Sequence, residues 1–168
     1  RPAVDVGISV SRVGGAAQTK AMKQVAGNLR LDLASYQELQ DFAQFGSDLD
    51  ATTQKQLTHG SRMTELLKQP RFKPFDVAEQ TVALYAGNEG YLDDLPVAQV
   101  LPFRDELLEV MRNSFAPLLR RLRTEKIEGS LKSSLDHALV DFKTQYLSRN
   151  AEASSADAAE ATAENEEQ

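Results

Sequence analysis

Arg12 is the residue of this sequence with the most distinctive chemical setting. It follows a short apolar segment, residues 4–10, and it precedes the glycine pair Gly14-Gly15. A guanidinium held at a strand end, beside backbone that can approach a ligand closely, suits recognition of a phosphate group. The residues alone favour a simpler alternative, in which Arg12 pairs with a carboxylate at a domain edge.

The remaining polar residues form no recognisable catalytic or metal-binding motif. The sequence has no cysteine and no Gly-x-x-x-x-Gly-Lys-Ser/Thr loop for phosphate. Asp48 and Asp50 could open a calcium loop, but its later ligands are missing, so a turn followed by a helix cap is favoured. His59 and His137 lie far apart in the sequence, and we expect ordinary surface or packing roles for both. The sequence therefore predicts no metal site.

Amphipathic helices must position these side chains, because apolar residues recur three and four residues apart from Ala16 onward. Residues 4–10 instead alternate as in a β-strand, and residues 11–15 are predicted to form a turn or loop. We therefore predict a mainly α fold, in which a helical bundle follows the last strand and loop of an α/β domain. The predicted helical segments are 16–26, 29–45, 50–67, 77–85, 103–122 and 131–146.

Three local signals mark the ends of these helices. Asp50 is a candidate N-cap for the segment that it opens. Asp76 and Glu79 have the spacing of a capping box, with an acid in place of the usual hydroxyl residue. Pro117 is expected to kink or split the helix in which it lies.

The charge distribution separates a body from a tail. The net charge is −6, from 19 basic and 25 acidic side chains, and six acids but no base lie within residues 151–168. Acids and bases therefore balance in the first 150 residues, which argues against a nucleic-acid partner bound through a basic face. The tail contains no aromatic residue, so we predict that residues 150–168 are disordered. No apolar run approaches 18 residues, so we expect no segment that spans a bilayer.

Three blocks of the sequence carry a family resemblance. Residues 2–11, Pro-Ala-Val-Asp-Val-Gly-Ile-Ser-Val-Ser, match a signature that α and β subunits of rotary ATP synthases share. The continuation through residue 27, together with Phe-Ala-Gln-Phe-Gly-Ser-Asp-Leu-Asp at 42–50 and Thr-Glu-Leu-Leu-Lys-Gln at 64–69, is similar to the α subunit in particular. The chain thus resembles the α subunit of F-type ATP synthases. The resemblance corresponds to the last third of an α chain, so we expect a C-terminal fragment.

This resemblance implies a place in a hexameric head, where three α and three β subunits alternate around a rotating central stalk. The catalytic sites lie mainly in β. In this family the arginine that follows the Ser-x-Ser motif is the arginine finger that α supplies to the β catalytic site, and by position it is Arg12. The resemblance reverses the earlier preference for an Arg12 that pairs with a carboxylate. It implies instead that Arg12 contacts the γ-phosphoryl group and stabilises charge in the transition state.

The resemblance also implies part of a non-catalytic nucleotide site, which in the complete complex holds ATP or ADP with Mg²⁺. Arg1 and Pro2 match residues of its adenine pocket, and Gln69 matches the first glutamine of a Gln-x-Gln segment. Arg71 replaces the second glutamine, with Pro70 between them, so this chain departs from the family at that contact. The family's phosphate-binding loop and magnesium ligands lie upstream. We therefore expect the fragment alone to be inactive and to bind no nucleotide tightly.

The implied organisation has three parts. Residues 1–19 would form the edge of the nucleotide-binding (P-loop) domain with the arginine-finger loop, residues 20–149 the helical C-terminal domain, and residues 150–168 the acidic tail. The implied partners are β subunits, the central-stalk γ subunit, which the loop at 46–50 would face, and the δ subunit or peripheral stalk. The complex would lie peripherally on the cytoplasmic face of a bacterial plasma membrane, or on the equivalent face of an organelle membrane, as part of an H⁺-transporting two-sector ATPase.

Two alternatives stay open. One is a related hexameric ring ATPase, such as a flagellar, secretion or vacuolar-type subunit. It would share the Ser-x-Ser signature but would not be expected to carry the blocks at 42–50 and 64–69 together. The other is a non-enzymatic helical interaction domain, for which the matching blocks are coincidence.

The gene sequence upstream of Arg1 tests the second alternative. We expect it to encode Gly-x-x-x-x-Gly-Lys-Ser/Thr, because an α subunit binds nucleotide phosphates through such a loop. Sequencing the source gene measures this directly, and an upstream region without the motif would contradict the ATP synthase interpretation.

Overall fold

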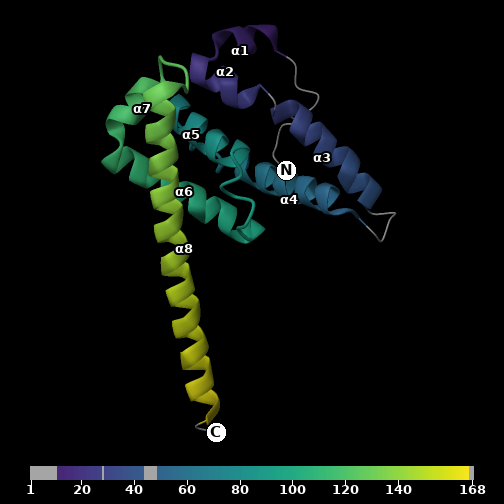
Figure 1. The fold of residues 1–168 in the computed structure, drawn as a ribbon, viewed down its shortest axis with the longest axis vertical. Coiled ribbons are helices and arrows are strands. Elements are labelled where there is room, and N and C mark those ends of the chain that lie inside the picture. Colours follow the sequence, from purple (N-terminus) through teal and green to yellow (C-terminus); the bar gives the residue numbers. More distant parts are fainter. Residues whose placement is uncertain (1–10, 28, 44–48, 167–168) are drawn as a thin grey trace.

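The computed structural model describes residues 11–27, 29–43 and 49–166, and the regular secondary structure in these ranges is helical (Figure 1). The predicted mainly α fold is thus confirmed, whereas the predicted strand at 4–10 lies outside the described residues. The helices are α1 (Arg12–Ala17), α2 (Lys20–Ala26), α3 (Leu29–Ala43), α4 (Ala51–Leu66), α5 (Val77–Asn88), α6 (Val97–Ser114), α7 (Ala116–Leu122) and α8 (Gly129–Glu166).

Helix α5 lies at the centre of the bundle. It packs against α2, α4, α6 and α7, while α3 packs on α4 and α8 packs on α6 and α7. Residues 81–83 and 85–87 are buried, and the stripe at 77, 80, 84 and 88 is half-buried, so no residue of α5 is fully exposed. A helix that is enclosed to this extent belongs to a core and not to a surface layer.

An aromatic cluster holds α8 against α6. The ring of Phe103 lies 5.0 Å from the ring of Phe142 and 5.0 Å from that of Tyr146, in edge-to-face arrangements. All three side chains are buried. Because this geometry pairs the positive edge of one ring with the negative face of another, it stabilises the contact beyond the area it buries.

The predicted helix ends are confirmed at three places. Asp50 caps α4 by accepting hydrogen bonds from the backbone N–H groups of Thr52 and Thr53 at 2.8 and 2.9 Å. Asp76 and Glu79 form the predicted capping box at the start of α5. Pro117 lies in the first turn of α7, so the predicted helix over 103–122 is split into α6 and α7.

The structure differs from the sequence prediction at the start of the described chain. Residues 11–15 are predicted to form a turn or loop, but α1 begins at Arg12. Ser11 makes this helix possible, because its hydroxyl oxygen accepts a hydrogen bond from the backbone N–H of Gly14 at 2.8 Å. The favourable cap offsets the weak helix propensity of the two glycines.

Helix α8 continues through most of the segment for which the sequence predicts disorder. It extends to Glu166 and leaves the body of the bundle (Figure 1). Alanine and glutamate are strong helix formers, and a helix already started in a packed region needs no new nucleus to continue. The absence of a docking face, on which the prediction of disorder rested, therefore does not end the helix.

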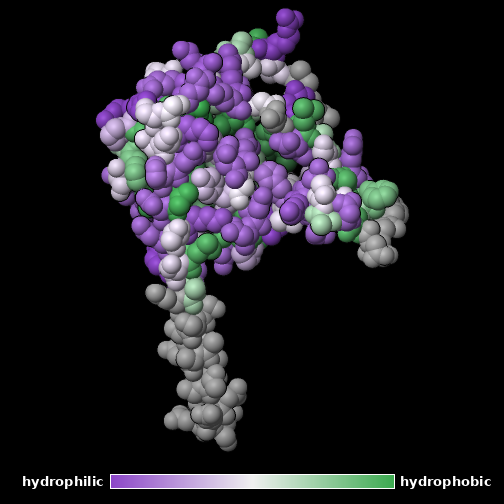
Figure 2. Space-filling model, in the orientation of Figure 1, coloured by the Kyte–Doolittle hydropathy of each residue, from purple (hydrophilic) through white to green (hydrophobic). Residues whose placement is uncertain are grey.

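Hydrophilic residues cover most of the face shown in Figure 2, and hydrophobic residues appear there in small patches. Although α8 is long, neither it nor any other helix in the described ranges combines the length and apolar character needed to cross a membrane.

A polar network joins α5 to α8. The hydroxyl of Tyr85 donates to Asp136 Oδ1 at 2.6 Å, and Lys132 Nζ donates to Tyr85 Oη at 2.7 Å and to Asp136 Oδ2 at 3.0 Å. Burial, together with the hydrogen bond to Asp136, raises the pKa of Tyr85 to about 12. Tyr85 therefore stays protonated and keeps donating to the carboxylate at neutral pH.

Tyr85→Phe is expected to lower the free energy of unfolding by about 1–2 kcal/mol, because it removes a hydrogen bond to a charged group. The folded-state pKa lies above the unfolded value of about 10, so this contribution is complete below pH 10 and is lost as the pH rises through about 12. Urea unfolding at pH 7 and above pH 10 measures both effects. Tyr146→Phe is the matched control, since the structure gives that hydroxyl no hydrogen bond within the described residues, and equal losses in the two variants would contradict the assignment.

Candidate functional site

Arg12 lies exposed on the first turn of α1. Within the described ranges no carboxylate pairs with its guanidinium, so the structure offers no carboxylate partner there for the simpler alternative raised by the sequence. Gly14 allows the Ser11 cap that holds this turn, because a Cβ at Gly14 would lie only 2.9 Å from the Ser11 hydroxyl oxygen. Arg12 is thus presented to solvent on a short, capped helix.

The adenine-pocket candidates divide between described and undescribed parts of the chain. Gln69 and Arg71 are exposed and lie two residues apart on the connection from α4 to α5. The guanidinium of Arg71 lies 4.6 Å from the centroid of the Phe72 ring. Arg1 and Pro2 lie outside the described residues, so the structure does not show how they lie relative to Gln69.

Arg104 of α6 is a site residue that the sequence analysis missed. It is 2% exposed, and its Nη1 donates to the backbone carbonyls of Leu66 at 3.2 Å and Lys68 at 2.5 Å. Its Nη2 forms an ion pair with Asp105 at 2.7 Å. A signal was available, because Arg104 precedes the apolar Leu107, Leu108 and Met111 by three, four and seven residues, so helical spacing predicts an apolar side chain at its position.

A cavity of about 270 Å³ lies between the α4–α5 connection and α6. Arg104 is paired with Asp105, and Arg112 is paired with Glu79 at 2.8 Å, so Lys73 carries the surplus positive charge of the lining. The wall beside Lys73 is partly aromatic. The lining residues are Pro70, Lys73, Phe75, Arg104, Asp105, Leu108 and Arg112.

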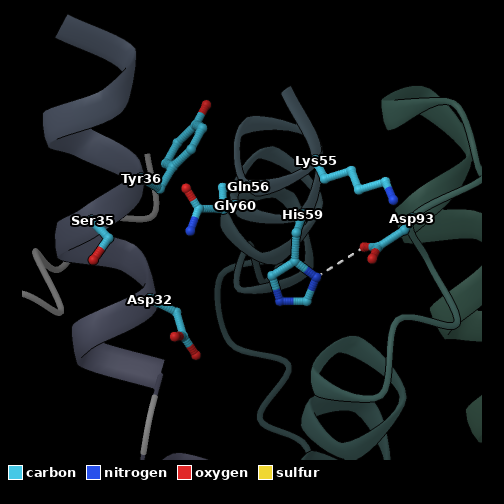
Figure 3. Close-up of a pocket in the computed structure, with 8 residues that line it drawn as sticks. All are labelled: Asp32, Ser35, Tyr36, Lys55, Gln56, His59, Gly60 and Asp93. Carbon is cyan, nitrogen blue, oxygen red and sulfur yellow. Dashed lines mark hydrogen bonds and ion pairs between the residues drawn. The ribbon is translucent and has the colours of Figure 1, made fainter. Parts of the chain in front are cut away.

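A second cavity, of about 300 Å³, lies between α3, α4 and the connection from α5 to α6 (Figure 3). His59 points toward Asp93, with 2.9 Å between Nδ1 and Oδ1. This contact ties α4 to the connection and agrees with the packing role expected for His59. His137 is exposed on α8. In the part of the chain that the structure describes, no group of three or more His, Asp or Glu side chains is arranged to hold a metal ion.

Gly60 forms one wall of this second cavity and sets the distance between α3 and α4. A Cβ at Gly60 would come within 2.4 Å of the ring of Tyr36. Glycine is therefore required for Tyr36 to lie directly on the backbone of α4.

The helical domain defines the class of protein to which the chain belongs. Residues 18–142 match the family model described as ATP synthase alpha/beta chain, C terminal domain. The chain belongs to this family.

Two curated relatives place the chain on the alpha side of the family. It is 53% identical over 147 residues to "ATP synthase subunit alpha" of Renibacterium salmoninarum, covering 88% of this chain and 27% of the relative. It is 54% identical over 144 residues to "ATP synthase subunit alpha 2" of Paraburkholderia xenovorans, covering 85% of this chain and 28% of the relative. The chain thus spans little more than a quarter of these relatives, and the predicted resemblance to the C-terminal part of α subunits is confirmed.

Gly60→Ala is expected to destabilise the protein by about 1–3 kcal/mol, because the added methyl group forces Tyr36 or all of α3 away from α4. Gly15→Ala is the matched control, since Gly15 is also helical and a Cβ there meets nothing within 4 Å. Both changes replace a helical glycine by alanine and so gain the same helix propensity. The difference between the two free energies of unfolding, measured in urea, therefore reports the clash. A Gly60→Ala protein as stable as Gly15→Ala would show that the close approach is not maintained in solution.

Proposed function

We propose that this chain is the C-terminal part of the α subunit of a rotary, proton-translocating ATP synthase, in which ATP synthesis is coupled to proton transport. The observation that carries the proposal is the 53% identity over 88% of the chain to a protein named as ATP synthase subunit alpha. At that identity the helical domain and its contacts within a larger assembly are expected to be shared.

In the proposed complex, Arg12 acts as the arginine finger. Its guanidinium reaches into a neighbouring β subunit, contacts the γ-phosphoryl group and stabilises the charge that develops in the transition state. Support comes from its position after the Ser-x-Ser motif and from its exposure on α1, where no described carboxylate neutralises it. A planar guanidinium can bind two phosphoryl oxygens at once, which a lysine cannot reproduce.

Gln69 contributes to the proposed non-catalytic nucleotide site, together with Arg1, Pro2 and the substituted position Arg71. The carboxamide of Gln69 can donate and accept hydrogen bonds, as the edge of an adenine ring requires. The nucleotide would be ATP or ADP, with Mg²⁺ held by upstream residues of the complete subunit. The chain described in this structure is proposed to be inactive without those residues.

The proposed partners follow from the same assignment. They are β subunits, a central-stalk γ subunit and a δ subunit or peripheral stalk, in a complex attached peripherally to the cytoplasmic face of a bacterial plasma membrane or the equivalent face of an organelle membrane. Of the loop proposed to face the central stalk, residues 46–48 lie outside the described residues.

Arg12→Lys in the full-length subunit is expected to permit assembly of the complex but to slow multisite ATP turnover, because several kcal/mol of transition-state stabilisation are lost. Steady-state ATP hydrolysis by the purified complex measures this. Arg120→Lys is the matched control, because Arg120 is also exposed near a helix end, and it should leave turnover unchanged. Near-normal turnover in Arg12→Lys would overturn the arginine-finger assignment.

A further inference from the structure

The segment 69–75, which joins α4 to α5, makes few backbone hydrogen bonds of its own. Within it the structure has one such bond, from Lys73 N–H to Pro70 O at 3.4 Å. Pro70 and Pro74 have no N–H to donate. The conformation of this segment must therefore be fixed by contacts from other parts of the chain.

The backbone of the segment also adopts an unfavourable conformation. Phe72 has a φ angle of +62°, in the left-handed region that residues with a Cβ rarely occupy. Such a conformation persists only where the surrounding structure fixes it. Phe72 itself and the preceding Arg71 are exposed. The contacts that fix this backbone conformation must therefore act at the two ends of the segment.

Arg104 supplies a contact at each end. At the α4 end its Nη1 donates to the carbonyls of Leu66 and Lys68, which the helix itself leaves without partners. At the α5 end its guanidinium lies 4.8 Å from the centroid of the Phe75 ring. The ion pair with Asp105 offsets its charge and holds the guanidinium in a fixed orientation.

We infer that Arg104 is a positioning residue for Gln69: by holding Lys68 and Phe75 it fixes the segment between them and thereby the placement of the Gln69 carboxamide. The ligand part of this inference, recognition of an adenine base by Gln69, rests on the proposed function. The structural part, restraint of the segment by Arg104, does not. A buried arginine that served stability alone could be replaced by an apolar side chain without changing what Gln69 recognises.

The test uses full-length α subunit carrying Arg104→Lys or Arg104→Met. Lysine keeps the charge, but it cannot donate to both carbonyls, pair with Asp105 and stack on Phe75 at the same time. Methionine keeps an apolar stem and removes the charge. If Arg104→Met does not fold, Arg104→Lys carries the experiment.

Amide hydrogen exchange at Lys68 and Lys73 is the first measurement, because their N–H groups donate to Glu65 O at 3.0 Å and to Pro70 O at 3.4 Å. We expect exchange at these two positions to be about tenfold faster in Arg104→Lys, as the loss of one hydrogen bond made by a charged group corresponds to roughly a tenfold change or more. Arg62→Lys is the matched control, because Arg62 is half-buried and donates to a backbone carbonyl of a different connection, Leu95 O at 3.1 Å. It should leave exchange at Lys68 and Lys73 unchanged, and unchanged exchange in both Arg104 variants would overturn the inference.

Equilibrium binding of MgATP and MgGTP to the same proteins is the second measurement. We expect Arg104→Lys to lose preference for ATP over GTP by about the same factor as Gln69→Ala, and the double variant to lose no more than Gln69→Ala alone. Additive losses would show that Arg104 acts independently of Gln69 and would overturn the positioning role. If Gln69→Ala keeps the full preference for ATP, the proposed role of Gln69 is wrong, and exchange of the segment alone then decides whether Arg104 restrains it.

Discussion

The burial of most of the surface of α5 is the constraint on which the arrangement of the other helices depends. A helix enclosed to this extent can be accommodated only if its neighbours approach closely and most of its polar groups are paired. Its small residues allow the close approach: a Cβ at Gly87 would lie 2.4 Å from Met63 Sδ, so the Met63 side chain of α4 lies directly on the α5 backbone. Most of its polar groups find partners, as Thr81 Oγ1 donates to Val77 O at 2.7 Å and Tyr85 donates to Asp136. Asn88 Nδ2 donates to Val25 O at 2.7 Å, whereas its buried Oδ1 has no partner among the described residues.

The capping box of α5 shows what sequence reasoning reaches and where it stops. The spacing of Asp76 and Glu79 predicts their mutual contacts, because both residues lie within one helical turn. It does not predict that Arg112 of α6 pairs with Glu79 or that Arg123, just after α7, pairs with Asp76. Those ion pairs join residues more than 30 positions apart, and only the folded packing of three helices brings them together.

In the candidate site, too, some residues can be predicted from the sequence and others cannot. Short-range patterns identify Arg12 and Gln69 through the family blocks in which they lie, and they identify Asp50 as a cap. They place Arg12 in a turn, because paired glycines suggest one, and they overlook the Ser11 hydroxyl that stabilises a helix there. They also overlook Arg104, whose effect on the Gln69 segment arises from a contact across 36 residues of sequence. Local propensity predicts elements and caps, whereas tertiary contacts decide how the connections are held.

The departure of α8 from the bundle gives the two halves of that helix different thermodynamics. Up to Tyr146 the helix is held by aromatic contacts and melts together with the core. Beyond Ala151 the backbone runs away from the other helices for about 20 Å, at a rise of about 1.5 Å per residue (Figure 1). There the helix–coil equilibrium alone governs its length, so warming shortens it gradually from the free end while the bundle stays intact. The protein thus joins a cooperative unit, which is either folded or unfolded, to an extension whose average length varies continuously with temperature.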